Sequence, residues 1–278
     1  MALDSSSRGA ALAPDVREIL DAAIGVLDGK PVPAFGPGFS ERCVETPWVA
    51  GFFRGGERLL DVGFTMSSLD YLGLLLELRR NRGVTIEAVD IVEPERVRRR
   101  YPAEWVDEVL AVPVTIGDLR VQRLPEGRYD IATCISTIEH IGFDEATYQD
   151  PNTAFKRSAT PEGVKLARDP DVERAVLARF AAALRPGGIA LVSVPMGRGG
   201  PALLRDSLGL YCAQWEYDRA SWQRLVTAPG FEVVDERFAR LEPDGTWKAV
   251  DGPQDLEQQS SELKPHAAGC ALVALRRT

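Results

Sequence analysis

The sequence of residues 58–63 is Arg-Leu-Leu-Asp-Val-Gly, a short apolar run that ends at a glycine. Such a run predicts a buried strand followed by a turn. The pattern of residues 69–80 predicts a helix, and residues 85–92 predict a second strand. A strand, a helix and a further strand form the repeating unit of α/β proteins with a parallel sheet.

Strands and helices continue to alternate along the chain. Further strands are predicted at residues 112–116, 129–135 and 188–194, and a helix at residues 171–184. Two last strands, at residues 231–241 and 267–276, are joined by a polar loop, so we expect them to pair antiparallel. The predicted fold class is therefore α/β: a doubly wound, Rossmann-like sheet of five parallel strands plus a C-terminal antiparallel pair, with helices on both faces.

The N-terminal part of the chain has a different pattern. Apolar side chains recur on one helical face over residues 14–27, and a second helical pattern covers residues 47–53. We expect residues 1–55 to form an N-terminal tail and helical cap, and residues 56–278 to form the main domain. Within that domain the long polar stretch 143–170 is a candidate lid.

Composition limits the class of protein. The 33 basic and 41 acidic residues give a formal net charge of −8, which argues against nucleic-acid and anionic-membrane partners. The cationic run 96–100 is expected to be a solvated helix face. No stretch resembles a signal peptide or a membrane span, and the four cysteines lie far apart, so a reducing cytoplasmic location is expected. The loop acids Asp144, Asp150 and Asp169 match no metal motif, and no metal site is predicted.

Three acidic residues occupy the ends of predicted strands. Asp61 ends the first strand, just before Gly63, Asp90 ends the second, and Asp118 follows the third. The intervals of 29 and 28 residues between these acids each fit one strand–helix unit. In open α/β sheets, ligands bind beyond the carboxyl ends of the strands, where the strand order reverses. We therefore expect a ligand site at this edge.

The loop after the first strand distinguishes two nucleotide-type cofactors. A dinucleotide requires glycines where the backbone approaches its pyrophosphate. Residues 63–68 are Gly-Phe-Thr-Met-Ser-Ser, with one glycine of the expected three. S-adenosylmethionine has no phosphate; it presents a ribose diol suited to Asp90, an exocyclic amine suited to Asp118, and an amino-acid tail near the first turn. The sequence therefore favours S-adenosylmethionine.

Five segments resemble class I S-adenosylmethionine-dependent methyltransferases, over roughly residues 45–276. They are RLLDVGF, IEAVDIVEP, TIGDLR, YDIATCISTIEHIG and LRPGGIALVSVP. The EHIG turn and the Arg-Pro-Gly-Gly turn are the most specific as a pair. The ETPWV and QWEYD segments are also similar to a bacterial branch that acts on small molecules and sugars.

The resemblance implies a set of cofactor contacts. They are Asp61 and Gly63 on the methionine side, Asp90 at the ribose, Asp118 with Leu119 at the adenine, Ser136 and Thr137 beneath the cofactor, and Ile91. The first loop departs from the family pattern, because Thr65 and Ser67 stand where glycines are usual; either their hydroxyls contact the methionine carboxylate or cofactor binding is weakened. From the residues alone, Asp90 also fits a helix cap and Asp118 a turn.

Candidate catalytic residues follow the fourth predicted strand. The acceptor of a methyl group must lose a proton, and His140 suits the role of general base. Packing against the cofactor is an alternative for His140, while Glu139 either orients it or fixes the turn. The other histidine, His266, is expected on the surface. Candidate acceptor walls, which equally fit a hydrophobic core, are Trp48, Tyr148, Trp215 and Tyr217.

These observations predict an enzyme that transfers a methyl group from S-adenosylmethionine to oxygen or nitrogen of a small polar molecule, such as a sugar or a natural-product intermediate. A catalytically silent methyltransferase-like binding or scaffold protein is the alternative, and the glycine-poor loop favours it. A nicotinamide-dependent oxidoreductase is disfavoured by the missing glycines and by the absence of a Tyr-x-x-x-Lys pair.

Overall fold

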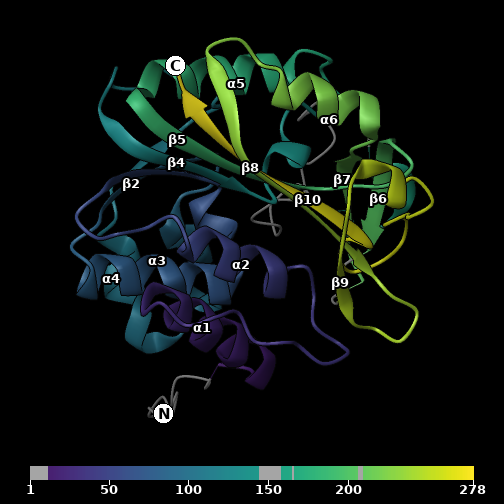
Figure 1. Ribbon diagram of the computed structural model, residues 1–278, viewed down its shortest axis with the longest axis horizontal. Coiled ribbons are helices and arrows are strands. Elements are labelled where there is room, and N and C mark those ends of the chain that lie inside the picture. Colours follow the sequence, from purple (N-terminus) through teal and green to yellow (C-terminus); the bar gives the residue numbers. More distant parts are fainter. Residues whose placement is uncertain (1–11, 144–157, 165, 206–208) are drawn as a thin grey trace, which may run out of the picture.

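The computed structural model describes residues 12–143, 158–164, 166–205 and 209–278 (Figure 1). Its main sheet consists of β1 (Arg58–Val62), β2 (Thr85–Asp90), β3 (Val114–Ile116), β4 (Tyr129–Ile135), β5 (Leu184–Pro195), β8 (Phe231–Leu241), β9 (Trp247–Val250) and β10 (Gly269–Arg277). The strand order is β3-β2-β1-β4-β5-β10-β8-β9. Strands β1 to β5 are parallel, whereas β10 is antiparallel to β5 and to β8, and β9 is antiparallel to β8.

The predicted α/β, Rossmann-like architecture is confirmed, but the number of strands is larger than predicted. The five parallel strands and the antiparallel pairing of β8 with β10 are present. In addition, β9 extends the sheet at its edge, and a separate hairpin of β6 (Gly200–Arg205) and β7 (Tyr211–Glu216) follows β5. The pattern missed β6 because Gly200 and Pro201, at its start, are typical of a turn.

Helices cover both faces of the sheet (Figure 1). One face carries α1 (Pro14–Leu27), α2 (Arg42–Ala50), α3 (Leu69–Asn81) and α4 (Val106–Leu110); the other carries α5 (Val172–Ala183) and α6 (Arg219–Val226). Successive strand residues point to opposite faces. Accordingly, Leu59 packs in the first cluster, with Leu72, and Leu60 in the second, with Phe180.

The second helix differs from its prediction. Pro47 was expected at its start, where proline is favoured, but α2 begins at Arg42 and Pro47 lies inside it. This earlier start has a consequence for the site, because Glu41 and Arg42 now stand at the N-terminal end of a helix that packs against α3.

Three further properties concern the described part of the chain. None of its helices combines the length and the apolar character that a membrane crossing requires. Within the same residues no group of histidine, cysteine and acidic side chains is placed to hold a metal ion. Cys43, Cys134, Cys212 and Cys270 are free thiols, all buried.

The topology fixes where a ligand can bind. From β1 the chain passes through β2 to β3 on one side of β1, and then returns to β4 on the other side. The strand order reverses at this point, so a crevice opens beyond the carboxyl ends of β1 and β4.

Candidate active site

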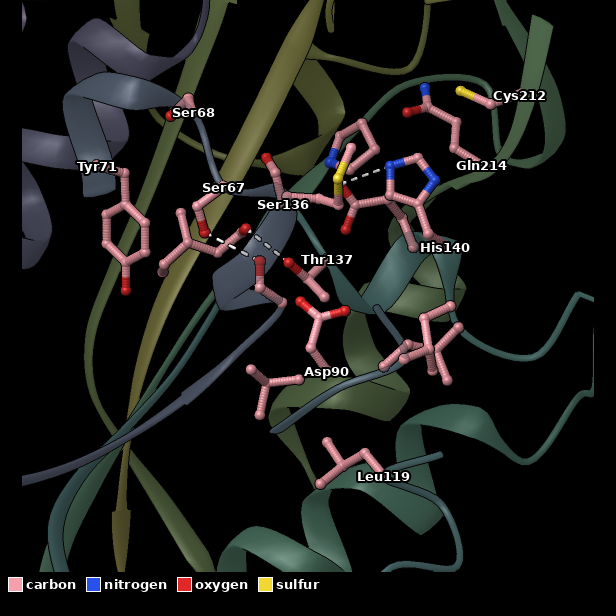
Figure 2. Close-up of a pocket in the computed structure, with 18 of the residues that line it drawn as sticks. Ser67, Ser68, Tyr71, Asp90, Leu119, Ser136, Thr137, His140, Cys212 and Gln214 are labelled. Carbon is pink, nitrogen blue, oxygen red and sulfur yellow. Dashed lines mark hydrogen bonds and ion pairs between the residues drawn. The ribbon is translucent and has the colours of Figure 1, made fainter. Parts of the chain in front are cut away.

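A cavity of about 260 Å³ lies at this reversal point (Figure 2). The predicted cofactor contacts that line it are Gly63, Asp90, Ile91, Asp118, Leu119, Ser136 and Thr137. Glu139 and His140 line it as well, whereas Asp61 and Thr65 are not among its lining residues. In Figure 2, Leu119 lies at one end, Asp90 and Thr137 in the middle, and His140, Gln214 and Cys212 at the other end.

Gly63 brings the loop after β1 into close contact with the loop after β4. Its backbone has φ +90° and ψ 20°, a left-handed conformation that glycine adopts without steric cost. A Cβ atom at this position would lie 2.4 Å from Thr137 Oγ1. Only glycine therefore lets these two segments meet.

Thr65 orients Asp90. The backbone N–H of Thr65 donates to Asp90 Oδ2, and that of Val92 donates to Asp90 Oδ1, both at 2.9 Å. The Thr65 hydroxyl donates to the Val92 carbonyl at 2.7 Å, so it is engaged in the protein rather than in the cavity. Burial raises the pKa of Asp90, whose carboxyl group lines the cavity while only 7% of the residue is exposed.

The glycine-poor loop is held from outside by a cationic side chain. Arg100 ends the 3₁₀ segment Pro94–Arg100 and donates from Nη1 to the Thr65 carbonyl and from Nη2 to the Ser67 carbonyl, both at 2.9 Å. Tyr101 also donates to the Thr65 carbonyl, at 2.9 Å. The prediction of a solvated helix face was therefore wrong for Arg100, because its guanidinium satisfies loop carbonyls.

Asp61 lies behind the cavity wall. Its Oδ1 accepts from Thr133 Oγ1 at 2.6 Å and from the Tyr71 hydroxyl at 2.8 Å. Burial raises the pKa of Asp61 to about 6. Tyr71 itself lines the cavity, so Asp61 reaches the site through the tyrosine that it holds.

Asp118 forms a local turn and also lines the cavity. Its carboxylate makes a local turn by accepting from the backbone N–H of Arg120 at 2.9 Å, and its side chain also lines the cavity, as does that of Leu119. The Arg120 guanidinium donates to Asp118 Oδ2 at 2.6 Å and to Asp169 Oδ2 at 2.9 Å. Arg120 therefore joins this end of the cavity to the segment before α5.

The hairpin fixes the orientation of His140. Its Nδ1 lies 2.9 Å from the Ala213 carbonyl in β7. A carbonyl oxygen only accepts, so the neutral ring carries its proton on Nδ1 and a lone pair on Nε2. Nε2 lies 3.9 Å from Glu139 Oε1. An element that the sequence did not predict thus selects the tautomer of His140 that carries its proton on Nδ1.

Glu139 is a buried acid, with 2% of the residue exposed. Its pKa is raised from the ordinary value of 4.5 to about 8, chiefly by burial; the backbone hydrogen bond opposes this rise, and the nearby carboxylate of Glu45 adds to it. At neutral pH the group therefore holds its proton in this structure.

We expect Glu139→Gln to make the protein more stable than the wild type at high pH. Because the folded-state pKa is raised, the stability contribution of Glu139 is fully present below about pH 4.5 and is lost as the pH rises to about 8. Glutamine is neutral throughout, so the variant should gain about 4 kcal/mol in free energy of unfolding relative to wild type between about pH 5 and pH 9. Urea unfolding at both pH values measures this gain.

The matched control is Glu126→Gln, at an exposed position away from the cavity. It should follow the wild-type pH dependence. The same pH dependence in Glu139→Gln would contradict the raised pKa.

Several lining residues were missed by the sequence analysis. Glu41 and Arg42 come from the start of α2, Gln214 from β7, and His266 from the loop before β10. The prediction of a surface position for His266 was wrong: it lines the cavity, with Nδ1 2.9 Å from the Ala267 carbonyl. One signal was available, because the chain has only two histidines and both line this cavity.

The aromatic candidates for an acceptor wall lie elsewhere. Trp48 donates from Nε1 to Asp235 Oδ2 at 2.6 Å, and the fully buried Tyr217 donates to Glu173 Oε1 at 2.6 Å. The ring of Trp215 lies against the guanidinium group of Arg168. Trp215 points to the side of β7 whose residues do not line the cavity. Tyr148 and most of the candidate lid 143–170 fall outside the described residues.

Comparisons with known proteins identify one family. A family model described as a methyltransferase domain matches residues 49–236, and a search of curated proteins finds no match. A solved S-adenosylmethionine-dependent methyltransferase from Methanosarcina mazei is 12% identical, with a TM-score of 0.49 over 83% of this chain and 97% of that one. The 1,6-didemethyltoxoflavin-N1-methyltransferase of Burkholderia thailandensis, solved with 1,6-didemethyltoxoflavin and S-adenosylhomocysteine, is 18% identical, with a TM-score of 0.49 over 100% and 98%.

Proposed function

Because the chain belongs to the family of methyltransferase domains, we propose that it transfers the methyl group of S-adenosylmethionine to nitrogen or oxygen of a small polar molecule. The match over residues 49–236 confirms the resemblance to class I S-adenosylmethionine-dependent methyltransferases, and with it the cofactor. The chemical class of the acceptor and the bacterial small-molecule and sugar branch belong to the proposal.

The observation that carries the proposal is that Asp90 and His140 line one cavity. Asp90 ends β2, and two backbone N–H groups direct its carboxylate, which retains lone pairs for a ribose diol. His140 lines the same cavity, and the Ala213 carbonyl fixes the orientation of its ring through Nδ1. A strand-end carboxylate for the cofactor and an oriented base for the acceptor together support this reaction.

The remaining lining residues fit the other parts of the cofactor. Leu119 and Ile91 offer apolar surface to the adenine, and the Asp118 carboxylate, which also binds Arg120, lines the cavity beside them as the proposed acceptor for the exocyclic amine. On the methionine side stand the guanidinium of Arg42 and the hydroxyl of Ser67. Because Arg42 begins α2, we propose that the N-terminal residues complete the cofactor site.

The chain's own contribution to the reaction is positioning and proton removal. When bound, S-adenosylmethionine supplies an electrophilic methyl group on a positively charged sulfur. His140 Nε2 takes the proton of the acceptor, and the Ala213 carbonyl steadies the imidazolium that forms by accepting from Nδ1. Burial of the site beneath the hairpin keeps both reactants aligned, which supplies a large part of the rate enhancement in a displacement at carbon.

Isothermal titration with S-adenosylhomocysteine tests the proposal. We expect one molecule to bind per chain with a dissociation constant of about 1–100 μM, corresponding to about −5 to −8 kcal/mol. A panel of small amines and alcohols is then incubated with S-adenosylmethionine, and mass spectrometry detects the gain of one methyl group. Absence of binding would contradict the methyltransferase function, whereas binding without transfer to any compound would favour the silent binding protein.

A further inference from the structure

Three buried polar side chains in the cavity carry atoms that lack a hydrogen-bond partner among the described residues. These atoms are Glu41 Oε2, Glu139 Oε2 and Gln214 Nε2. The residues are 7%, 2% and 3% exposed, and all three line the cavity. Buried polar groups are nearly always paired, since an unpaired one loses its hydration without compensation. Their common position points to a ligand that supplies the missing partners.

The charge around these groups is negative. Arg42 acts on both Glu41 and Glu139, but its guanidinium already forms an ion pair with Glu45. The other oxygen of Glu45 accepts from Ser136 at 2.8 Å, so Glu45 is satisfied. Two further groups near the carboxyls are the imidazoles of His140 and His266.

A second acid near Arg42 is satisfied within the protein. Asp70 accepts from the Thr46 hydroxyl at 2.6 Å. Burial raises the pKa of Glu41 and of Asp70, as it does that of Glu139. The surroundings of Glu41 and Glu139 therefore favour the uptake of positive charge, either as protons or as a cationic ligand.

We propose that Glu41, Glu139 and Gln214 bind the acceptor, and that the acceptor is a small amine, protonated in solution, with its nitrogen between the two carboxyl groups. This inference rests on the proposed methyltransferase function. An ammonium group has three N–H donors and a positive charge, so it satisfies both carboxyl oxygens at once. An alcohol has a single O–H donor, and a carboxylate is repelled. The Gln214 amide then donates to an oxygen or ring nitrogen of the same molecule.

The proposal sets the order of bond changes. One N–H bond of the ammonium breaks and its proton moves to His140 Nε2, which leaves a lone pair on nitrogen. That pair forms the new bond to the methyl carbon, while the carbon–sulfur bond breaks and its electrons stay on sulfur. The products are an N-methylammonium and an uncharged thioether, so the positive charge that sulfur loses appears on the nitrogen between Glu41 and Glu139.

Matched fragments test the charge preference. Benzylamine, benzyl alcohol and benzoate share a ring and differ in carrying a positive charge, no charge or a negative charge. Each is titrated calorimetrically into the protein saturated with S-adenosylhomocysteine at pH 7. We expect benzylamine to bind at least about tenfold more tightly than benzyl alcohol, and benzoate more weakly than both, because hydrogen bonds to charged groups are the stronger ones.

Proton release provides a second, independent measurement. The pKa of Glu139, about 8, leaves it protonated at pH 7, and a cation beside it favours the charged form. Binding of benzylamine should therefore release about one proton, seen as a heat that differs between buffers of different ionisation enthalpy. Benzyl alcohol should release none, and Glu139→Gln should abolish the release.

Variants separate this subsite from the cofactor subsite. Glu41→Gln and Glu139→Gln should each weaken benzylamine binding about tenfold or more while S-adenosylhomocysteine affinity stays within about twofold. The exposed Glu126→Gln should change neither. Equal binding of the three fragments, or binding of none, would overturn the amine proposal and leave the methyltransferase function intact.

A different result would assign the carboxyl groups of Glu41 and Glu139 to the cofactor instead of the acceptor. If Glu41→Gln and Glu139→Gln weaken S-adenosylhomocysteine as much as benzylamine, the carboxyls hold the ammonium of the cofactor, and the proposal fails. Failure of the wild type to bind S-adenosylhomocysteine would overturn the methyltransferase function itself, and this inference with it.

Discussion

Asp90→Ala should weaken the binding of S-adenosylhomocysteine by about 100-fold or more, because it removes two charge-assisted hydrogen bonds to the ribose. Asp90 is buried at the end of β2, and its carboxylate lines the cavity. Water does not replace a lost partner easily at such a position, so most of the loss appears in the dissociation constant. Isothermal titration of the variant measures it.

The same carboxylate also supports the loop after β1, and the variants must separate the two roles. Asp90 accepts from the backbone of Thr65 and of Val92. Asp90→Asn keeps the shape and one carbonyl acceptor but not the charge, and we expect it to lose about tenfold in affinity. Asp107→Ala, at an exposed position, is the control. Affinity within twofold of wild type in Asp90→Ala would show that Asp90 serves the loop alone.

Much of the fold followed from local pattern. The limits of β4 and β8 coincide with the predicted ranges 129–135 and 231–241, because continuous or alternating runs of apolar residues predict strands. The strand β9 and the hairpin β6–β7 did not follow. Their pairing depends on tertiary contacts rather than on local sequence. In addition, β6 begins with glycine and proline, which are typical of a turn and not of a strand.

The site residues also divide into those that the sequence predicted and those that only the folded chain reveals. Asp90 and Asp118 were found because topology places the carboxyl ends of parallel strands at one edge, whereas Leu119 and Ser136 followed from the family resemblance. Glu41 and Gln214 were missed because they reach the cavity through the packing of α2 and through a hairpin. Arg100 shows the converse case: a charged run is typical of a solvated surface, and only the folded chain reveals the carbonyls that this one side chain satisfies.

His140→Asn should reduce kcat by about 10²–10⁴, the usual contribution of a general base, while S-adenosylhomocysteine affinity stays close to wild type. Asparagine retains an N–H donor near the position of Nδ1 and so preserves the contact with the Ala213 carbonyl. It lacks any group that replaces Nε2. A fall in kcat with intact binding therefore separates proton removal from support of the hairpin. Turnover is measured as methyl transfer to an acceptor found in the mass-spectrometric panel.

The matched control is His266→Asn, because His266 lines the same cavity and also has Nδ1 near a backbone carbonyl. If His140 is the base, His266→Asn retains most of kcat. The pH profile of kcat/KM then has a rising limb in the wild type, and His140→Asn loses this limb. Glu139→Gln should keep that limb, which distinguishes the imidazole from the neighbouring acid. A large loss in His266→Asn with normal turnover in His140→Asn would transfer the role of base to His266. If neither substitution slows turnover, the acceptor loses its proton to water, and the cavity contributes alignment alone.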